Sequence, residues 1–390
     1  SPPSFPDARS RLQRLMAVLH DEVARKRLPG AVAVVARHGK MALLDSVGQL
    51  NPATGEAMHR DARFRIYSMT KPIVSVAAMM LVEEGRLLLA DPVARHLNEF
   101  ADQKLAVQES GTLQMQPVRH PARIHDLLRH TAGMTYEFLG NSPVQRQYTQ
   151  LRIGSRERSL ADFTQQLASL PLMYEPGTVF EYSRATDVLG RVIEVVSGQS
   201  LPDFLRERIF DPLGMPDTAF TVPADFHGHI AEPFSRDPDG GVQMKVIDVR
   251  SDAALASGGG GLISTAIDYA RFLQFMLNRG ELDGVRLLGP RTVDFMTCDH
   301  LDDIPVANTG SRALLPMGHG FGLGFAVRKH LGVAPVPGSV GTYFWGGLAG
   351  TTFFVDPALD MFAILMLQAP NQREYYRMLF RDMVYAAVMD

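Results

Sequence analysis

The segments that favour β-strands lie near the two ends of this 390-residue chain, and a mainly helical stretch separates them. Residues 31–48 form two strand-like runs about His38-Gly39, which predicts an antiparallel hairpin. Strand-like runs return near the other end, at residues 320–327, 350–356 and 361–368. We therefore expect an α/β (α+β) fold, in which both termini build one antiparallel sheet flanked by helices.

Helical periodicity and chain length predict how the rest is organised. A chain of 390 residues is long for one core, so two domains are expected. We assign residues 1–90 and 251–390 to an α/β domain and residues 91–250 to an inserted, mainly helical domain. Helices are expected near residues 7–27 and 374–388, and another after the glycine run at 258–261, capped by Ser264 or Thr265.

Composition excludes several classes of protein. The formal charge of −3 gives no basic surface for nucleic acid or an anionic membrane. The single Cys298 cannot form an internal disulfide, and the lack of a second thiol argues against a cysteine-based metal site. The apolar run Ile73–Val82 is far shorter than the roughly 20 residues of a membrane span. The chain starts at Ser1 without a signal-like segment, so a leader either has been removed or never existed, and we expect a soluble, cytoplasmic protein. No cofactor and no metal are expected.

The stretch FRIYSMTKPIVSVAAMMLVEEG, from Phe64 to Gly85, carries the main chemical signal. Ser68 and Lys71 are three residues apart, so one helix would place them on one face. Pro72 fits only near a helix start, and the following apolar run predicts a buried helix. A serine needs a base to become a nucleophile, and Lys71 supplies one candidate. The alternative is a surface helix with a serine cap and a solvated lysine.

Two further motifs accompany this Ser-x-x-Lys. FEYSRATDVLG contains Tyr182, and YFWGGLAGTTFFVD contains Trp345-Gly346-Gly347. Together with HDLLRHTAGM, PLGMPDTAF and SGGGGLISTAIDYARF, these motifs resemble the penicillin-binding, serine β-lactamase superfamily from Val32 to Val388. The combination is most similar to the family VIII carboxylesterases, which have a class C β-lactamase fold. The resemblance implies that fold, and a serine hydrolase.

The resemblance also implies roles for individual residues. Ser68 is the expected nucleophile, held or activated by Lys71, with Tyr182 as the general base. A phenol of ordinary pKa, about 10, is protonated at neutral pH, so a cation such as Lys71 would have to favour its phenolate. Which of Lys71 and Tyr182 removes the proton stays open.

Other residues are expected to bind the substrate. The backbone N–H groups of Ser68 and Leu348 are expected to form an oxyanion hole. Trp345, Gly346 and Gly347 are expected beside the substrate. Tyr136 either lines the pocket or serves packing. Asp187 could brace Arg184 or the loop of Tyr182.

Departures from the family pattern favour an ester as the substrate. Trp345 replaces the lysine that helps β-lactamases and DD-peptidases to hold a carboxylate, and Arg184 replaces an asparagine. We expect hydrolysis of short-chain esters, a small-molecule partner, and weak or no β-lactamase activity. A DD-peptidase, a D-amino-acid amidase or an acyltransferase is the alternative, and a non-catalytic interaction protein is the second. No Gly-x-Ser-x-Gly elbow supports an α/β-hydrolase, and His227–His229 is interpreted as a loop rather than a metal site. The sequence does not predict an oligomeric state.

Overall fold

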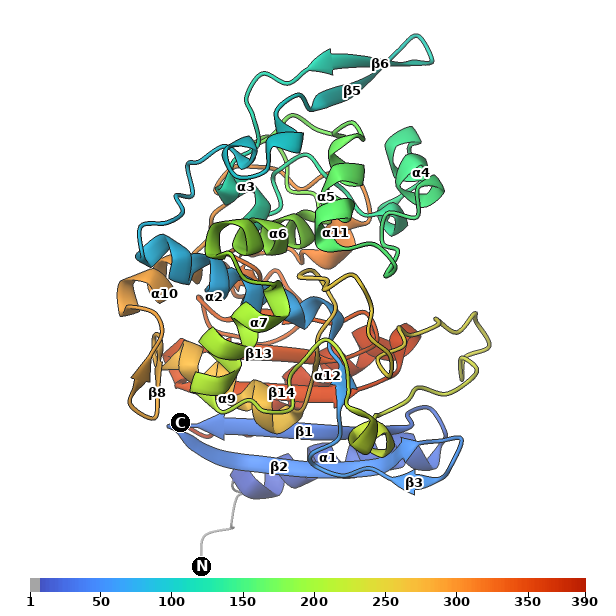
Figure 1. Ribbon diagram of the computed structural model, residues 1–390. Coiled ribbons are helices and arrows are strands. Elements are labelled where there is room, and N and C mark those ends of the chain that lie inside the picture. Colours follow the sequence, from blue (N-terminus) through green and yellow to red (C-terminus); the bar gives the residue numbers. More distant parts are fainter. Residues whose placement is uncertain (1–7) are drawn as a thin grey trace, which may run out of the picture.

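The computed structural model describes residues 8–390, and an eight-stranded antiparallel sheet organises them (Figure 1). Strand β14 pairs with β1, so the two ends of the chain meet in the middle of the sheet, as predicted. In spatial order the strands are β10 (His319–Phe321), β11 (Ala326–Arg328), β12 (Tyr343–Gly346), β13 (Thr352–Asp356), β14 (Met361–Leu367), β1 (Gly30–Arg37), β2 (Lys40–Asn51) and β3 (Glu56–Ala57).

Turn chemistry sets two of the hairpins. His38 and Gly39 join β1 to β2 with φ of +54° and +72°, the left-handed pair that a tight two-residue turn requires. The prediction of one strand over residues 320–327 is wrong. The chain reverses there between β10 and β11, and Gly324 takes φ +112° in the turn.

Helices cover both faces of the sheet. Helices α1 (Ala8–Ala24) and α12 (Arg373–Tyr385) pack on one face, and α9 (Ala266–Leu277) packs on the other. Alternation along β1 serves both cores: Ala33 and Val35 join the cluster under α1 and α12, whereas Val32 and Val34 join the larger one. Thr265 caps α9 by accepting from the Asp268 N–H at 3.0 Å, which confirms the predicted cap.

A helical segment lies above the sheet in Figure 1, and α2 (Thr70–Glu83) lies between the two. Helix α2 packs against α6 and α7. The remaining α-helices are α3 (Ile124–Leu128), α4 (Pro143–Gln150), α5 (Leu160–Ala168), α6 (Ala185–Ser197), α7 (Leu201–Leu205), α8 (Asp211–Leu213), α10 (Pro290–Met296) and α11 (Ser311–Leu314). Short strand pairs are β4 (Phe64–Arg65) with β7 (Ile263–Ser264), β5 (Lys104–Glu109) with β6 (Thr112–Pro117), and β8 (Glu281–Leu282) with β9 (Val285–Arg286).

The division into domains at residues 90 and 250 stays a prediction. Some residues assigned to the helical domain (91–250) contact the α/β domain. Ile230 forms a β-bridge with Arg63, and the Glu232 N–H donates to the Leu50 carbonyl at 2.9 Å. Within residues 8–390, every helix is too short or too polar to cross a membrane.

Candidate active site

Ser68 lies in a short 3₁₀ turn, Tyr67–Met69, immediately before α2 begins at Thr70. Ser68 was expected in the first turn of the buried helix. It lies instead in the 3₁₀ turn just before that helix, and Lys71 lies in the first turn of the helix. Tyr67 has φ +41°, in the left-handed region, which costs a non-glycine residue of order 1–3 kcal/mol. The residue before Ser68 is thus held in a conformation that its surroundings must enforce.

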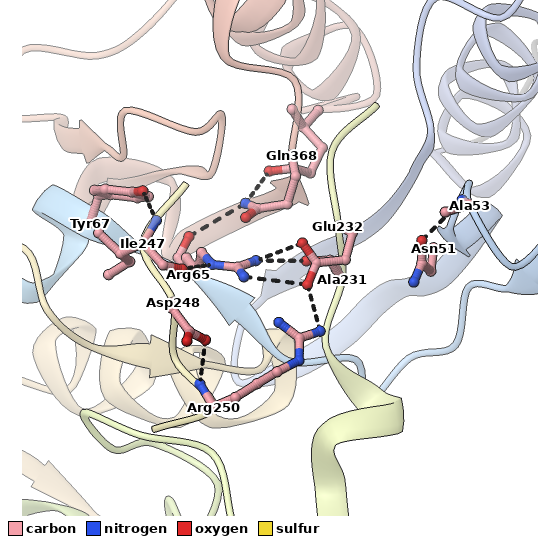
Figure 2. Close-up of polar contacts among 11 residues, drawn as sticks. Asn51, Ala53, Arg65, Tyr67, Ala231, Glu232, Ile247, Asp248, Arg250 and Gln368 are labelled. Atoms are coloured by element: carbon pink, nitrogen blue, oxygen red, sulfur yellow. Dashed lines mark hydrogen bonds and ion pairs between the residues drawn. The ribbon is translucent and has the colours of Figure 1, made fainter. Parts of the chain in front are cut away.

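Polar contacts around Tyr67 supply that support (Figure 2). The Ile247 N–H donates to the Tyr67 hydroxyl at 2.9 Å, and Arg65 Nε donates to the Ile247 carbonyl at 2.6 Å. The buried Arg65 also pairs with Glu232, at 3.2 and 3.3 Å. Both polar backbone groups of Ile247 are therefore used to hold the turn that carries Ser68.

Ser68 meets both expected partners. Its Oγ accepts a hydrogen bond from Lys71 Nζ at 3.2 Å and another from the Tyr182 hydroxyl at 2.5 Å. Lys71 Nζ also lies 4.4 Å from the centre of the Tyr182 ring. The structure thus brings together three residues that span more than a hundred positions of the sequence.

Lys71 is fully buried, and three oxygen atoms surround its amine. Besides Ser68, Nζ donates to the Tyr136 hydroxyl at 2.8 Å and to the Gly259 carbonyl at 2.7 Å. Burial lowers the pKa of Lys71 to about 7; nearby Asp187 partly opposes this shift and Arg184 adds to it. An amine with that pKa is neutral in a large fraction of molecules at neutral pH.

Asp187 supports Lys71 indirectly. Its carboxylate accepts from the Gly259 N–H at 3.0 Å and from the Ser257 hydroxyl, and so holds the residue whose carbonyl accepts from Lys71. A Cβ on Gly259 would lie 2.9 Å from the Asp187 carboxylate, so this approach requires glycine. The sequence predicts Asp187 as a brace for Arg184 or for the loop of Tyr182. The Asp187 carboxylate does lie 3.8 Å from Arg184 Nη1, but its hydrogen bonds go to Ser257 and Gly259.

Tyr182 is also buried and hydrogen-bonded. Besides donating to Ser68, its hydroxyl accepts from the indole N–H of Trp345 at 3.1 Å. Burial raises the pKa of Tyr182 above its ordinary value, although these hydrogen bonds oppose the shift. Burial therefore opposes the phenolate that a neighbouring cation was expected to favour, and the role of Tyr182 as the general base stays a prediction.

Tyr136 and Arg184 form the adjoining wall. The Tyr136 ring stacks on Phe138 at 4.7 Å, and Arg184 lies 5.0 Å above the same ring. The Arg184 guanidinium forms an ion pair with Glu137. Tyr136 therefore combines the two roles that the sequence left open, because it lines the cavity and also packs.

A cavity of about 720 Å³ opens beside Ser68. Trp345, Gly346, Gly347 and Leu348 line it together with Ser68, Tyr136 and Tyr182. Within residues 8–390, the backbone N–H groups of Ser68 and Leu348 have no hydrogen-bond acceptor. Two unoccupied donors beside a nucleophile are what an oxyanion hole requires.

One group of side chains in residues 8–390 lies close enough together to hold a metal ion. Ligand atoms of His59, Asp61 and His229 lie within 4.8 Å of one another. None of the three lines the cavity, so an ion there would not touch Ser68. His227, the other histidine of this stretch, contacts the Val222 carbonyl at 2.9 Å.

Comparison with known proteins gives this arrangement a family. The family model described as Beta-lactamase matches residues 9–387. The chain belongs to the beta-lactamase family. Esterase EstB of Burkholderia gladioli is 34% identical to this family member, over 97% of this chain and 96% of its own length. The lovastatin esterase of Penicillium rubens is 29% identical, over 88% and 89%.

A solved structure agrees with these relatives. EstCE1, described as a hydrolase with promiscuous acyltransferase activity, matches this beta-lactamase family member with a TM-score of 0.81 and 28% identity. The match covers 97% of this chain and 99% of EstCE1. The predicted fold and the resemblance to family VIII carboxylesterases are thereby confirmed.

Proposed function

We propose that this carboxylesterase cleaves esters through an acyl-enzyme on Ser68. The observation that carries the proposal is the position of Ser68 Oγ, within hydrogen-bond distance of both Lys71 and Tyr182 at the wall of the cavity. A hydroxyl placed between an amine and a phenol can lose its proton to one group while the other serves the leaving group.

Lys71 is the proposed proton acceptor. With a pKa of about 7, lowered by burial, its neutral amine takes the Ser68 proton as Oγ attacks the ester carbonyl. The carbonyl oxygen becomes an oxyanion in the tetrahedral intermediate. The N–H groups of Ser68 and Leu348 stabilise that charge.

Tyr182 completes the first half of the reaction. Its neutral hydroxyl gives a proton to the departing alcohol oxygen, and the ammonium of Lys71 restores that proton. The products at this stage are the free alcohol and the acyl-enzyme. A water molecule then attacks the acyl carbonyl while Lys71 takes one of its protons. The bond between the acyl carbon and Ser68 Oγ breaks, Lys71 returns that proton to Oγ, and the acid and free Ser68 are released.

The groups at the two altered motif positions favour a neutral ester. The Trp345 N–H already donates to Tyr182, and the guanidinium of Arg184 is paired with Glu137. Neither group replaces the lysine that holds a carboxylate in β-lactamases. The rings of Tyr136, Tyr182 and Trp345 pack against one another beside Ser68, at centroid distances of 5.1 and 5.3 Å, which favours a short acyl group there.

A matched substrate series tests this proposal. We expect kcat/KM for p-nitrophenyl acetate and butyrate to exceed that for benzylpenicillin and nitrocefin by several orders of magnitude, where each factor of ten is about 1.4 kcal/mol. Activity should also fall along esters of increasing acyl length. Penicillin turnover that rivals the short esters would contradict the proposal, and would identify another cation for the carboxylate.

Acyl transfer is the second candidate. EstCE1 is described as having promiscuous acyltransferase activity, and the cavity of about 720 Å³ has room for an alcohol as well as an acyl group. The test adds a primary alcohol to the ester assay. A new ester product, formed at the expense of free acid, would support acyl transfer.

The cytoplasmic location that the sequence suggests stays a prediction.

A further inference from the structure

Helix α12 places an arginine, Arg377, beside the Trp345-Gly346-Gly347 motif and at the wall of the same cavity. Arg377 Nη2 donates to the Gly347 carbonyl at 2.5 Å and to the Thr351 carbonyl at 3.3 Å. Its Nη1 lies 3.3 Å from the carboxylate of Glu374, which is exposed. Burial lowers the pKa of Arg377 to about 10, so its guanidinium stays charged at neutral pH.

The carbonyl that Arg377 holds belongs to the same peptide group as the Leu348 N–H. A peptide group is planar and trans, so its C=O and N–H point in opposite directions. Fixing the Gly347 oxygen toward α12 therefore fixes the Leu348 hydrogen toward the opposite side. Leu348 lines the cavity with Ser68, and its N–H has no acceptor within residues 8–390.

The two glycines of the motif make this arrangement possible. A Cβ on Gly346 would lie 2.6 Å from Arg377 Nη2, and a Cβ on Gly347 would lie 2.5 Å from the Ile66 carbonyl. Ile66 comes two residues before Ser68. The peptide is thus confined between α12 on one side and the turn of the nucleophile on the other.

We propose that Arg377 is a positioning residue for the oxyanion hole, which orients and polarises the Gly347–Leu348 peptide. A charged donor on a carbonyl strengthens the N–H of the same peptide as a donor. The Leu348 N–H then stabilises the oxyanion of the tetrahedral intermediate without reorienting during the reaction. This inference rests on the proposed function, in which that N–H faces the substrate.

The test replaces Arg377 with methionine or lysine and measures kcat and KM for p-nitrophenyl butyrate. Active sites are counted by titration with a fluorophosphonate, so that unfolded protein does not enter kcat. Removal of an oxyanion donor costs about 10²–10³ in kcat, and a misoriented donor should cost roughly 10- to 100-fold, with KM nearly unchanged. The lysine variant should keep part of the lost rate.

A boronic acid inhibitor separates positioning from general damage, since its tetrahedral adduct places an oxygen in the oxyanion hole. Its inhibition constant should rise in step with the loss of kcat. Arg328→Met is the matched control, because Arg328 is also buried and donates to loop carbonyls, those of His330 and Leu331. This control should lower stability but leave kcat per titrated site unchanged.

Two results have different meanings. Wild-type protein that neither reacts with the fluorophosphonate nor hydrolyses esters would overturn the proposed function. Wild-type protein that does both, together with Arg377→Met whose kcat per site and boronic acid inhibition stay within about threefold of wild type, would overturn only the role of Arg377.

Discussion

At the scale of single residues, burial reverses the ordinary roles of the two groups beside Ser68. Both side chains leave water, but burial favours the neutral form of each: it lowers the pKa of Lys71 to about 7 and raises the pKa of Tyr182. The amine can therefore accept a proton at neutral pH, and the phenol can donate one. This division of roles is part of the proposed mechanism, and it depends on burial, which the motif alone does not predict.

The pH dependence of kcat/KM tests whether Lys71 is the proton acceptor. Protonated Lys71 cannot accept the Ser68 proton, so activity should rise with pH through a midpoint near 7. Arg184→Met removes a cation that lowers the pKa of Lys71, so the midpoint should move to higher pH. A profile without this limb, rising only toward the ordinary phenol pKa of about 10, would instead identify a Tyr182 phenolate as the base.

The variant Tyr182→Phe tests whether the Tyr182 hydroxyl is the proton donor to the departing alcohol. The variant keeps the ring and its packing against Trp345 but lacks the hydroxyl 2.5 Å from Ser68 Oγ. We expect kcat to fall by about 10²–10⁴ with KM little changed, as for loss of a general acid or base. Steady-state kinetics on p-nitrophenyl butyrate measures this. A normal kcat would leave Lys71 to carry out both proton transfers.

At the scale of elements, the site depends on how closely the end of β12 approaches the turn of Ser68. The backbone of Ile66 makes this contact, since a Cβ on Gly347 would lie 2.5 Å from the Ile66 carbonyl oxygen. The same Cβ would lie 2.6 Å from Oγ1 of Thr351, a buried β-branched side chain with little room to move. A larger residue would therefore displace β12 from the nucleophile.

Gly347→Ala should accordingly lower kcat/KM by roughly 10- to 100-fold, because small displacements of catalytic groups are costly. It should also lower the free energy of unfolding by about 1–3 kcal/mol, the usual cost of overpacking. The control is Gly332→Ala, where a Cβ meets no atom within 4 Å. Ester kinetics and urea unfolding on both variants provide the measurement; equal behaviour of the two would refute the close approach.

At the scale of the whole molecule, distant segments are tied together behind the site. Arg65 comes just before the nucleophile, and Glu232 lies 167 residues later. Their side chains are 2% and 17% exposed, so the pair is largely removed from water. Such a pair contributes less than its charges suggest, but either partner is costly to leave alone.

Glu232→Met should therefore lower the free energy of unfolding by about 2–4 kcal/mol, since it leaves the buried charge of Arg65 without its carboxylate. The double variant Arg65→Met/Glu232→Met should be no less stable than Glu232→Met. Asp21→Asn, which breaks an exposed ion pair with Arg25, should cost less than about 1 kcal/mol. Urea denaturation checks all three, and additive losses in the double variant would contradict the pairing.

The same scale explains what the sequence could predict. Ser68, Lys71, Tyr182 and Trp345 stand in short motifs, and the buried strands near both ends are short continuous apolar runs, so the sequence predicts both. The contacts that hold these residues in place could not be predicted from the sequence. Gly259 meets Lys71 across 188 residues and Arg377 meets Gly347 across 30, and neither pairing leaves a local pattern. The left-handed Tyr67 was also hidden, because a tyrosine carries no signal for positive φ.

The central claim is a covalent acyl-enzyme on Ser68, and one measurement addresses it directly. Wild-type protein and Ser68→Ala are mixed with p-nitrophenyl butyrate, quenched in acid during turnover, and analysed by peptide mass spectrometry. We predict one butyryl group on the wild-type peptide that contains Ser68 and none on the variant, whose ester turnover falls by about 10³ or more. Turnover by Ser68→Ala at the wild-type rate, or acylation of another residue, would contradict the account.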